Sequence, residues 1–260
     1  MEPALPPGAV DVVIGGHQRG ESHDWLDAMG LTNARVLRYI RENPEEPLPP
    51  PAAGPCNSTI EAVGLFPNHG RDAAAFYDYV SRNYDALPEL VVFVHGHGHR
   101  SWHATCRALV GRARRAYGRL AADPADDLVR SHTFTLTEYP NEPNASYIGI
   151  SDGYYKTYKT FAHMPAYASC LALLANLSLS LDAETSQSCC ASLISPRAAI
   201  RRQPRATYEA LARYIAAEPD DYGAGVVCFE QLVWKLVAEP PPTDETLAFY
   251  RESEHFENAC

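Results

Sequence analysis

The segment from Val91 to His103 joins a short apolar run to four histidines, at positions 95, 97, 99 and 103. The apolar run predicts a buried strand, and the histidines begin where that strand ends. Ligands of open α/β sheets bind outside the carboxyl ends of the strands. Imidazole is a common metal ligand and the usual acid or base near neutral pH. This segment therefore predicts the functional edge of a sheet.

Further strands and helices alternate along the chain. Strands are predicted over 9–15, 34–40, 61–65, 91–95, 132–137 and 189–194, and helices over 22–29, 68–84, 102–120, 154–180, 204–217 and 225–237. The alternation indicates βαβ units with right-handed crossovers and a mostly parallel sheet. We therefore expect one α/β domain over 9–238, with a Rossmann-like sheet flanked by helices. A short tail, 1–8, is expected before it, and an acidic tail, 239–260, after the proline-rich boundary.

Composition excludes several classes of protein. A net charge of −10 argues against a nucleic-acid-binding protein, which would usually carry a basic face. The chain has no run of eighteen apolar residues and no signal-peptide pattern at its start, so we expect neither a membrane span nor a leader. Its seven cysteines form no CxxC pair, which disfavours a zinc ribbon. Glycosylation sequons at Asn57, Asn144 and Asn176 slightly favour a glycoprotein, and the secretory lumen and the cytoplasm stay equally open.

The histidine cluster has two interpretations. In an extended segment His95, His97 and His99 point to the same side, a geometry that suits one divalent metal such as Mn²⁺ or Mg²⁺. Such a metal would act as a Lewis acid or neutralise phosphate charge. In the alternative interpretation, the histidines hydrogen-bond to nearby backbone and end the strand.

The segment Asn68-His69-Gly70-Arg71-Asp72 precedes a predicted helix. Free N–H groups at a helix start favour anions, and Arg71 could form a forked pair with a phosphate or carboxylate. Asn68 or Asp72 could instead only cap the helix. Because the next strand ends at His95, we expect both segments at the same edge of the sheet.

Two weaker signals lie further along the chain. The segment Gly149-Ile150-Ser151-Asp152-Gly153 matches the G-x-S-x-G pattern of hydrolases, in which Ser151 would be the nucleophile. The polar segment before it does not resemble the buried strand that a nucleophile elbow requires. Glu230, four residues before Trp234 on an amphipathic helix, could be a general base or simply a solvated side chain.

The order of several short motifs resembles the DUF3431 family over residues 9 to 237. The motifs are Trp25-Leu26, Asn68-x-Gly70-Arg71-Asp72-Ala73, Asn83-Tyr84-Asp85-x-Leu87-Pro88, Phe93-Val94-His95, Trp102-His103, Ser195-Pro196-Arg197-x-x-Ile200-Arg201 and Glu230-x-Leu232-x-Trp234. The Asn-x-Gly-Arg-Asp step and the strand ending in histidine are also similar to rhamnan-synthesis-type proteins, which are glycosyltransferase-like. The resemblance implies a GT-A-like nucleotide-sugar fold, in which His95-Gly96-His97 replaces the usual metal-binding Asp-x-Asp motif.

The implied function is sugar transfer from a nucleotide-sugar donor to a hydroxyl on a carbohydrate or other acceptor. The candidate residues fall into three roles. The catalytic candidates are Glu230 and His103; the donor-binding candidates are Asn68, Gly70, Arg71, Asp72 and Trp102; the metal-binding candidates are His95, His97 and His99. Two rivals stay open: a hydrolase, either a Ser151 esterase or a histidine-metal phosphoesterase, and a non-catalytic carbohydrate-binding protein.

Overall fold

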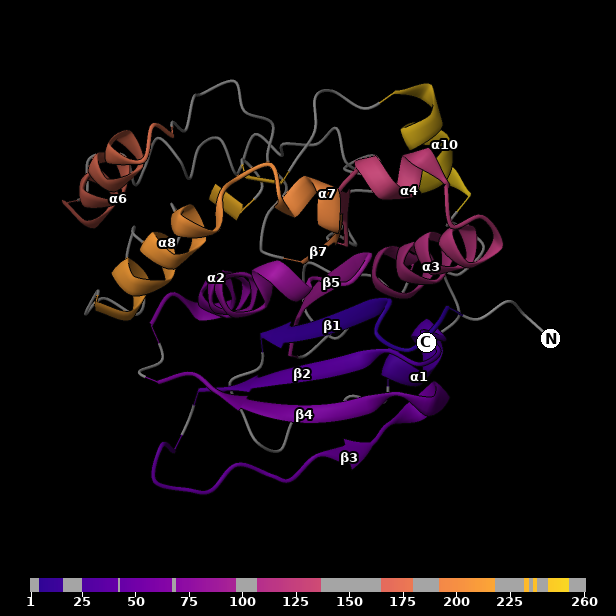
Figure 1. Ribbon diagram of the computed structural model, residues 1–260, viewed down its shortest axis with the longest axis horizontal. Coiled ribbons are helices and arrows are strands. Elements are labelled where there is room, and N and C mark those ends of the chain that lie inside the picture. Colours follow the sequence, from indigo (N-terminus) through magenta and orange to yellow (C-terminus); the bar gives the residue numbers. More distant parts are fainter. Residues whose placement is uncertain are drawn as a thin grey trace.

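A seven-stranded sheet forms the centre of the computed structural model. The structure describes residues 5–15, 25–41, 43–66, 69–96, 107–136, 165–179, 192–217, 232–233, 236–237 and 243–252. The strands are β1 (Val10–Gly15), β2 (Arg35–Ile40), β3 (Ala52–Ala53), β4 (Thr59–Gly64), β5 (Leu90–His95), β6 (Phe134–Thr135) and β7 (Leu193–Pro196). Their order across the sheet is β3-β4-β2-β1-β5-β7-β6. Figure 1 shows this order from β3 to β7.

The four strands β4, β2, β1 and β5 are parallel to one another. The chain proceeds outward from β1 through β2 to β4 and then returns to β5 on the other side of β1. Two further strands, β3 and β7, run antiparallel to their neighbours β4 and β5, and β6 runs antiparallel to β7. The predicted α/β fold is therefore confirmed, with a sheet that is parallel in its centre and mixed towards its edges.

Eight α-helices lie in the described part of the chain. They are α1 (Trp25–Met29), α2 (Arg71–Asn83), α3 (Arg112–Ala122), α4 (Asp127–Ser131), α6 (Pro165–Asn176), α7 (Arg197–Ile200), α8 (Arg205–Ala217) and α10 (Asp244–Arg251). Single turns η1 (Pro55–Asn57) and η2 (Tyr84–Ala86) and a π-helical turn η4 (Arg107–Gly111) complete the set. Among the described helices, none has the length and apolar character needed to cross a membrane.

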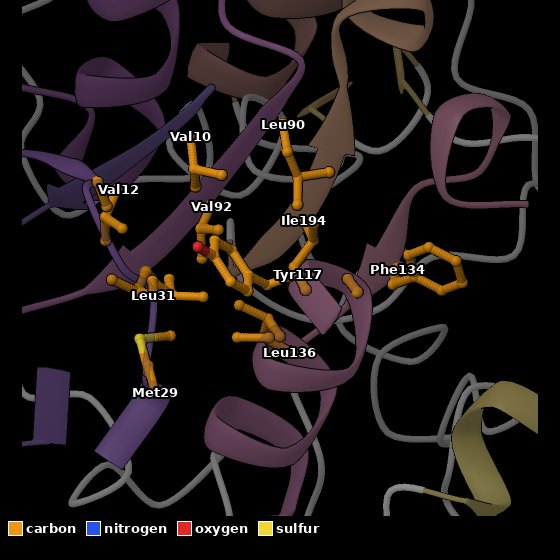
Figure 2. Packing of buried hydrophobic residues seen from close by; sticks show 14 of the residues in the cluster. Val10, Val12, Met29, Leu31, Leu90, Val92, Tyr117, Phe134, Leu136 and Ile194 are labelled. Carbon is orange, nitrogen blue, oxygen red and sulfur yellow. The ribbon is translucent and has the colours of Figure 1, made fainter. Parts of the chain in front are cut away.

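Side chains of the central strands alternate between two cores, as the period of two along a strand requires. Val13 and Phe93 face the core that contains α2 and α8. Val12 and Val92 face the opposite core, where α1, α3, α4 and α10 lie. Figure 2 shows the second core, with Tyr117 of α3 among the aliphatic side chains of β1, β5 and β7. Helices therefore cover both faces of the sheet.

Three of the differences between the sequence predictions and the structure affect the sheet and its cores most. The proline-rich loop over 43–55 contains the two-residue strand β3, which pairs at the edge of the sheet, where prolines beside a strand remove no central ladder bond. The late strand predicted over 189–194 is shifted to Leu193–Pro196. The expected tail 239–260 contains α10, whose Phe249 and Tyr250 are buried in the core because apolar side chains favour burial over solvent.

Candidate functional site

The carboxyl ends of three parallel strands meet the start of α2 at one end of the sheet, which we call its carboxyl edge. β1 ends at Gly15 and β5 ends at His95, and these two residues are direct partners in the strand register. Arg41 directly follows the end of β2. Asp72 lies in the first turn of α2, which follows β4 in the chain. The four residues, which we call the edge cluster, therefore come from four different elements.

Alternation along the strands brings these residues to the same face. Val13, Tyr39 and Phe93 pack in the core beneath α2. Gly15, Arg41 and His95 each lie two residues further along the chain, so they point to the same side. At these positions the strands end and the packed core gives way to polar side chains.

A contact between the Asp72 carboxylate and the His95 imidazole is the centre of the cluster. Nδ1 of His95 contacts Oδ2 of Asp72, and each side chain is only 11% exposed. Because a carboxylate can only accept hydrogen bonds, the contact places a proton on Nδ1. In the neutral imidazole Nε2 is then the basic nitrogen, the one that accepts a proton or binds a metal. The pair therefore fixes both the tautomer and the orientation of the ring.

Arg41 holds the other oxygen of Asp72. Its Nη2 donates to Oδ1 of Asp72 at 3.2 Å and to the carbonyl oxygen of Gly15 at 3.4 Å. The Arg41 side chain is only 3% exposed, so its charge is desolvated, and the Asp72 carboxylate compensates it. Asp72 thus accepts from a guanidinium on one oxygen and from an imidazole on the other. Sequence reasoning missed Arg41, although its position two residues beyond Tyr39 on the same face was a usable signal.

Glycine at position 15 permits the close approach of α2. A Cβ at Gly15 would lie 2.6 Å from Oδ1 and 2.9 Å from Cβ of Asp72, closer than real Cβ contacts. Any larger residue would displace the Asp72 carboxylate from Arg41 and His95. Gly15 is therefore a structural requirement of the edge cluster.

The start of α2 is built from a second glycine. Gly70 caps the helix with a left-handed backbone, φ 68°, that glycine adopts readily. A Cβ there would collide with Ile215 of α8. His69 contacts the carbonyl oxygen of Ala216 through Nδ1 at 3.3 Å. Both residues therefore fix the start of α2 against the end of α8, which positions Asp72.

The edge cluster lies where the order of the strands reverses. From β1 the chain adds β2 and β4 on one side, and β5 is then added on the other side. In open α/β sheets this reversal leaves a crevice outside the carboxyl ends of the two strands, and ligands bind there. The reversal falls between β1 and β5, the strands that end at Gly15 and His95.

Several predicted site residues lie outside the described residues. They are Asn68, His97, His99, Trp102, His103, Ser151 and Glu230. Arg71 begins α2, and only its backbone is described. The structure therefore brings together two of the predicted residues, Asp72 and His95, and adds Gly15 and Arg41 to them.

The described residues alone do not form a metal site. No group of three or more histidine, cysteine, aspartate or glutamate side chains suited to a metal occurs among them. Asp72 is already engaged by Arg41 and His95, so a metal at this edge would take Nε2 of His95 as its ligand from the cluster. The remaining ligands would come from outside the described ranges, where His97 and His99 stand.

Comparison with known proteins gives one match. No curated protein and no solved structure matches the chain. The model of the DUF3431 family, described as a protein of unknown function, matches residues 12–244. This match spans most of the 260 residues and includes every member of the edge cluster. The chain therefore belongs to the DUF3431 family.

Proposed function

We propose that this protein is a glycosyltransferase-like enzyme that moves a sugar from a nucleotide-sugar donor to a hydroxyl acceptor. The observation that carries the proposal is the position of the edge cluster, at the strand-order reversal between β1 and β5. Nucleotide ligands of doubly wound sheets bind at such a reversal, with their phosphates at a helix start. On this proposal the sheet is Rossmann-like and, more closely, GT-A-like.

The proposal assigns the donor's diphosphate to the space beside the start of α2 and His95. Protonated His95, stabilised by Asp72, would donate from Nε2 to a diphosphate oxygen. That hydrogen bond strengthens as the bond between the sugar C1 and the diphosphate breaks and negative charge develops on the leaving oxygen. Arg41 does not contact the donor in this scheme and keeps the Asp72 carboxylate in place.

On this proposal, the acceptor hydroxyl is deprotonated by a residue outside the described ranges. The acceptor hydroxyl forms the new bond to C1 and gives its proton to Glu230, the candidate base, with His103 as the second catalytic candidate. Asn68, Gly70, Arg71 and Trp102 are proposed on the donor side, with Gly70 acting through the shape of the helix start. Alternatively, a divalent ion, Mn²⁺ or Mg²⁺, held by His95, His97 and His99 would neutralise diphosphate charge when bound; Nε2 of His95 would then be a metal ligand in place of a hydrogen-bond donor to the diphosphate.

A thermal-shift panel of nucleotides, nucleotide sugars and metals tests the proposal. We expect UDP- or GDP-sugars to raise the melting temperature, more strongly with manganese, because a ligand that binds only the folded state stabilises it. His95→Ala should abolish the shift. His132→Ala is the matched control, since His132 precedes β6 at the opposite end of the sheet and should keep the full shift. Wild-type protein that shows no shift with any nucleotide sugar would argue against glycosyl transfer.

A histidine-metal phosphoesterase is the second candidate. The observation that favours it is the Asp72–His95 contact, since a carboxylate behind a histidine is the usual arrangement of a metal-binding or basic imidazole. A phosphoesterase would release phosphate from p-nitrophenyl phosphate without any acceptor, and His95→Ala would abolish that release. Sugar binding without turnover of any donor or ester would instead support a non-catalytic carbohydrate-binding protein.

A further inference from the structure

A polar cavity lies at the opposite end of the sheet from the edge cluster. It has a volume of about 230 Å³ and is lined by Glu89, Arg130, Pro196, Arg197, Ala198 and Arg201. Glu89 directly precedes β5, whereas His95 ends it. Six strand residues at about 3.3 Å each separate the two sites by roughly 20 Å. The cavity is therefore distinct from the proposed donor site.

The wall of this cavity is positively charged, although the protein as a whole is acidic. Three guanidinium groups and one carboxylate leave it with two positive charges, in a protein with a net charge of −10. Arg197 and Arg201 belong to the Ser195–Arg201 motif, which the proposed glycosyl transfer does not use. Such a local concentration of arginine in an acidic protein indicates an anionic ligand.

Backbone and side-chain contacts hold the three arginines in place. Arg197 pairs with Glu89 and donates from Nε to the Pro88 carbonyl oxygen at 3.3 Å. Arg130 donates to the Pro124 carbonyl oxygen at 3.0 Å, and its Nη2 lies 3.7 Å from Glu89.

Arg201 donates from Nη2 to the carbonyl oxygens of Tyr84 and Asp85, both at 3.1 Å. A guanidinium has five N–H donors, and each of the three arginines makes only two of the contacts named above. The side chains are therefore preorganised and keep donors for a ligand.

We propose that this cavity binds the dianionic phosphate group of a small molecule. A phosphate monoester carries a charge of about −1.5 to −2 at pH 7, which matches the two positive charges of the wall. Guanidinium forks bind phosphate oxygens in pairs, with geometry that ammonium groups lack. The volume lies below the roughly 300–1,000 Å³ of pockets for drug-sized ligands, so the ligand is small or inserts only its phosphate group.

Titration calorimetry at constant ionic strength, with inorganic phosphate and glycerol 3-phosphate as probes, tests this site. We expect saturable binding of both probes if the phosphate group alone is recognised, and preference for the ester if the molecule around it contributes. Arg130→Gln and Arg201→Gln should each weaken binding about tenfold or more. Arg201→Lys should also weaken it, because the charge remains but the fork is lost. Glu89→Gln should tighten binding, because it removes the negative charge from the wall.

Two control variants separate this site from other anion sites. Arg213→Gln, on the exposed side of α8 and outside the cavity, should bind phosphate as wild type does. His95→Ala should also keep wild-type affinity. The proposal would be overturned if neither inorganic phosphate nor glycerol 3-phosphate bound to the protein. It would also be overturned by unchanged affinity in both Arg130→Gln and Arg201→Gln, or by loss of affinity in His95→Ala, which would assign the phosphate to the edge cluster.

Discussion

Asp72 is the residue on which the candidate site depends most directly. Its two oxygens accept from Arg41 and His95, which come from the ends of β2 and β5. Arg41 is almost fully buried, so the carboxylate both neutralises a desolvated charge and orients an imidazole. A single side chain thus couples the stability of this sheet edge to its chemistry.

Replacing Asp72 with asparagine should therefore destabilise the protein. The change keeps the size of the side chain but removes the carboxylate charge that pairs with the buried Arg41 guanidinium, and should cost about 3–5 kcal/mol. Urea denaturation of Asp72→Asn measures the loss. Asp85→Asn is the matched control, since Asp85 is 81% exposed and its ion pair with Arg205 contributes little. Equal free energies of unfolding for both variants would contradict this account of the edge cluster.

Two glycines should respond oppositely to substitution by alanine. Gly15→Ala forces a Cβ into Asp72, and overpacking of this kind costs about 1–3 kcal/mol. Gly118 lies inside α3, and a Cβ there meets nothing within 4 Å, so Gly118→Ala should stabilise by up to about 1 kcal/mol through helix propensity. Thermal unfolding of both variants shows whether each substitution raises or lowers the stability of the protein. A neutral Gly15→Ala would show that α2 can move away from β1 without cost.

At the scale of elements, a buried polar group ties α2 to the amino-terminal ends of β1 and β2. Asp11 is 2% exposed and accepts from Arg35 at 2.5 and 3.1 Å and from the Tyr79 hydroxyl at 2.6 Å. Burial, with the neighbouring Asp11 carboxylate, raises the pKa of Tyr79 well above its usual range. The hydroxyl therefore stays protonated and remains a donor at physiological pH.

Substitutions of Asp11 and Tyr79 should lower the free energy of unfolding by clearly different amounts. Asp11→Asn removes the carboxylate charge that accepts from both Arg35 and Tyr79. Because the Arg35 side chain is 34% exposed and can be solvated, the cost should stay below the roughly 3–5 kcal/mol of a fully buried pair but exceed that of Tyr79→Phe. Tyr79→Phe removes one hydrogen bond and should cost about 1–3 kcal/mol, because the buried carboxylate loses one of its donors. Equilibrium denaturation gives both values, and a smaller loss for Asp11→Asn than for Tyr79→Phe would contradict the ranking.

The stabilisation of the short helix α4 by its capping residue, Asp126, should depend on pH. Asp126 accepts from the Val129 N–H at 3.0 Å and from Nε of Arg119 at 2.6 Å. Burial alone would raise the pKa of Asp126, but the hydrogen bonds from Arg119 and Val129 outweigh it and lower the pKa below its usual range. A lowered pKa in the folded state means that the ionised carboxylate stabilises the fold above its unfolded pKa.

Asp126→Ala should therefore cost about 1 kcal/mol near pH 7, the usual value of a helix cap. The difference from wild type should stay constant down to the usual aspartate pKa of about 4 and shrink as the pH falls below it. Denaturation curves across this pH range measure the difference. A difference that does not change between neutral and acidic pH would show that the charge of Asp126 is not involved.

At the scale of the whole molecule, the carboxyl-terminal helix α10 completes the second core. Phe249 is 1% exposed and stacks on Phe134 of β6 with ring centroids 4.0 Å apart. Tyr250 is also buried, and its hydroxyl accepts a hydrogen bond from the Thr135 N–H at 3.1 Å. The family match ends at residue 244, where α10 begins, so the molecule's packed structure extends beyond the matched segment.

Phe249→Ala should accordingly cost about 3–5 kcal/mol, the usual loss for a large aromatic side chain in a core. Leu48→Ala is a suitable control, because Leu48 is 40% exposed and should change stability by less than about 0.5 kcal/mol. Thermal or chemical unfolding distinguishes the two. A Phe249→Ala variant as stable as the control would show that α10 is peripheral to folding.

Local patterns were sufficient to predict much of the fold. The apolar runs that became β1, β2 and β5 begin and end within one residue of their predicted bounds, because a buried strand needs both faces apolar. The helical spacing of apolar residues also predicted α2 and α8. α10 was missed because its few apolar residues follow a proline-rich segment, and only the core that receives Phe249 and Tyr250 reveals their role. Membership of the DUF3431 family, predicted from ordered motifs, is confirmed.

The sequence by itself determined that His95 ends a strand and that Asp72 lies near the start of the preceding helix, since both positions follow from local periodicity. Only the tertiary structure decided that the two side chains meet and that Arg41 joins them. Arg41 and Asp72 are 31 residues apart, and their contact depends on the order of β2, β1 and β5 in the sheet. Strand order is set by the packing of helices on both faces, and no local pattern around Arg41 contains that information.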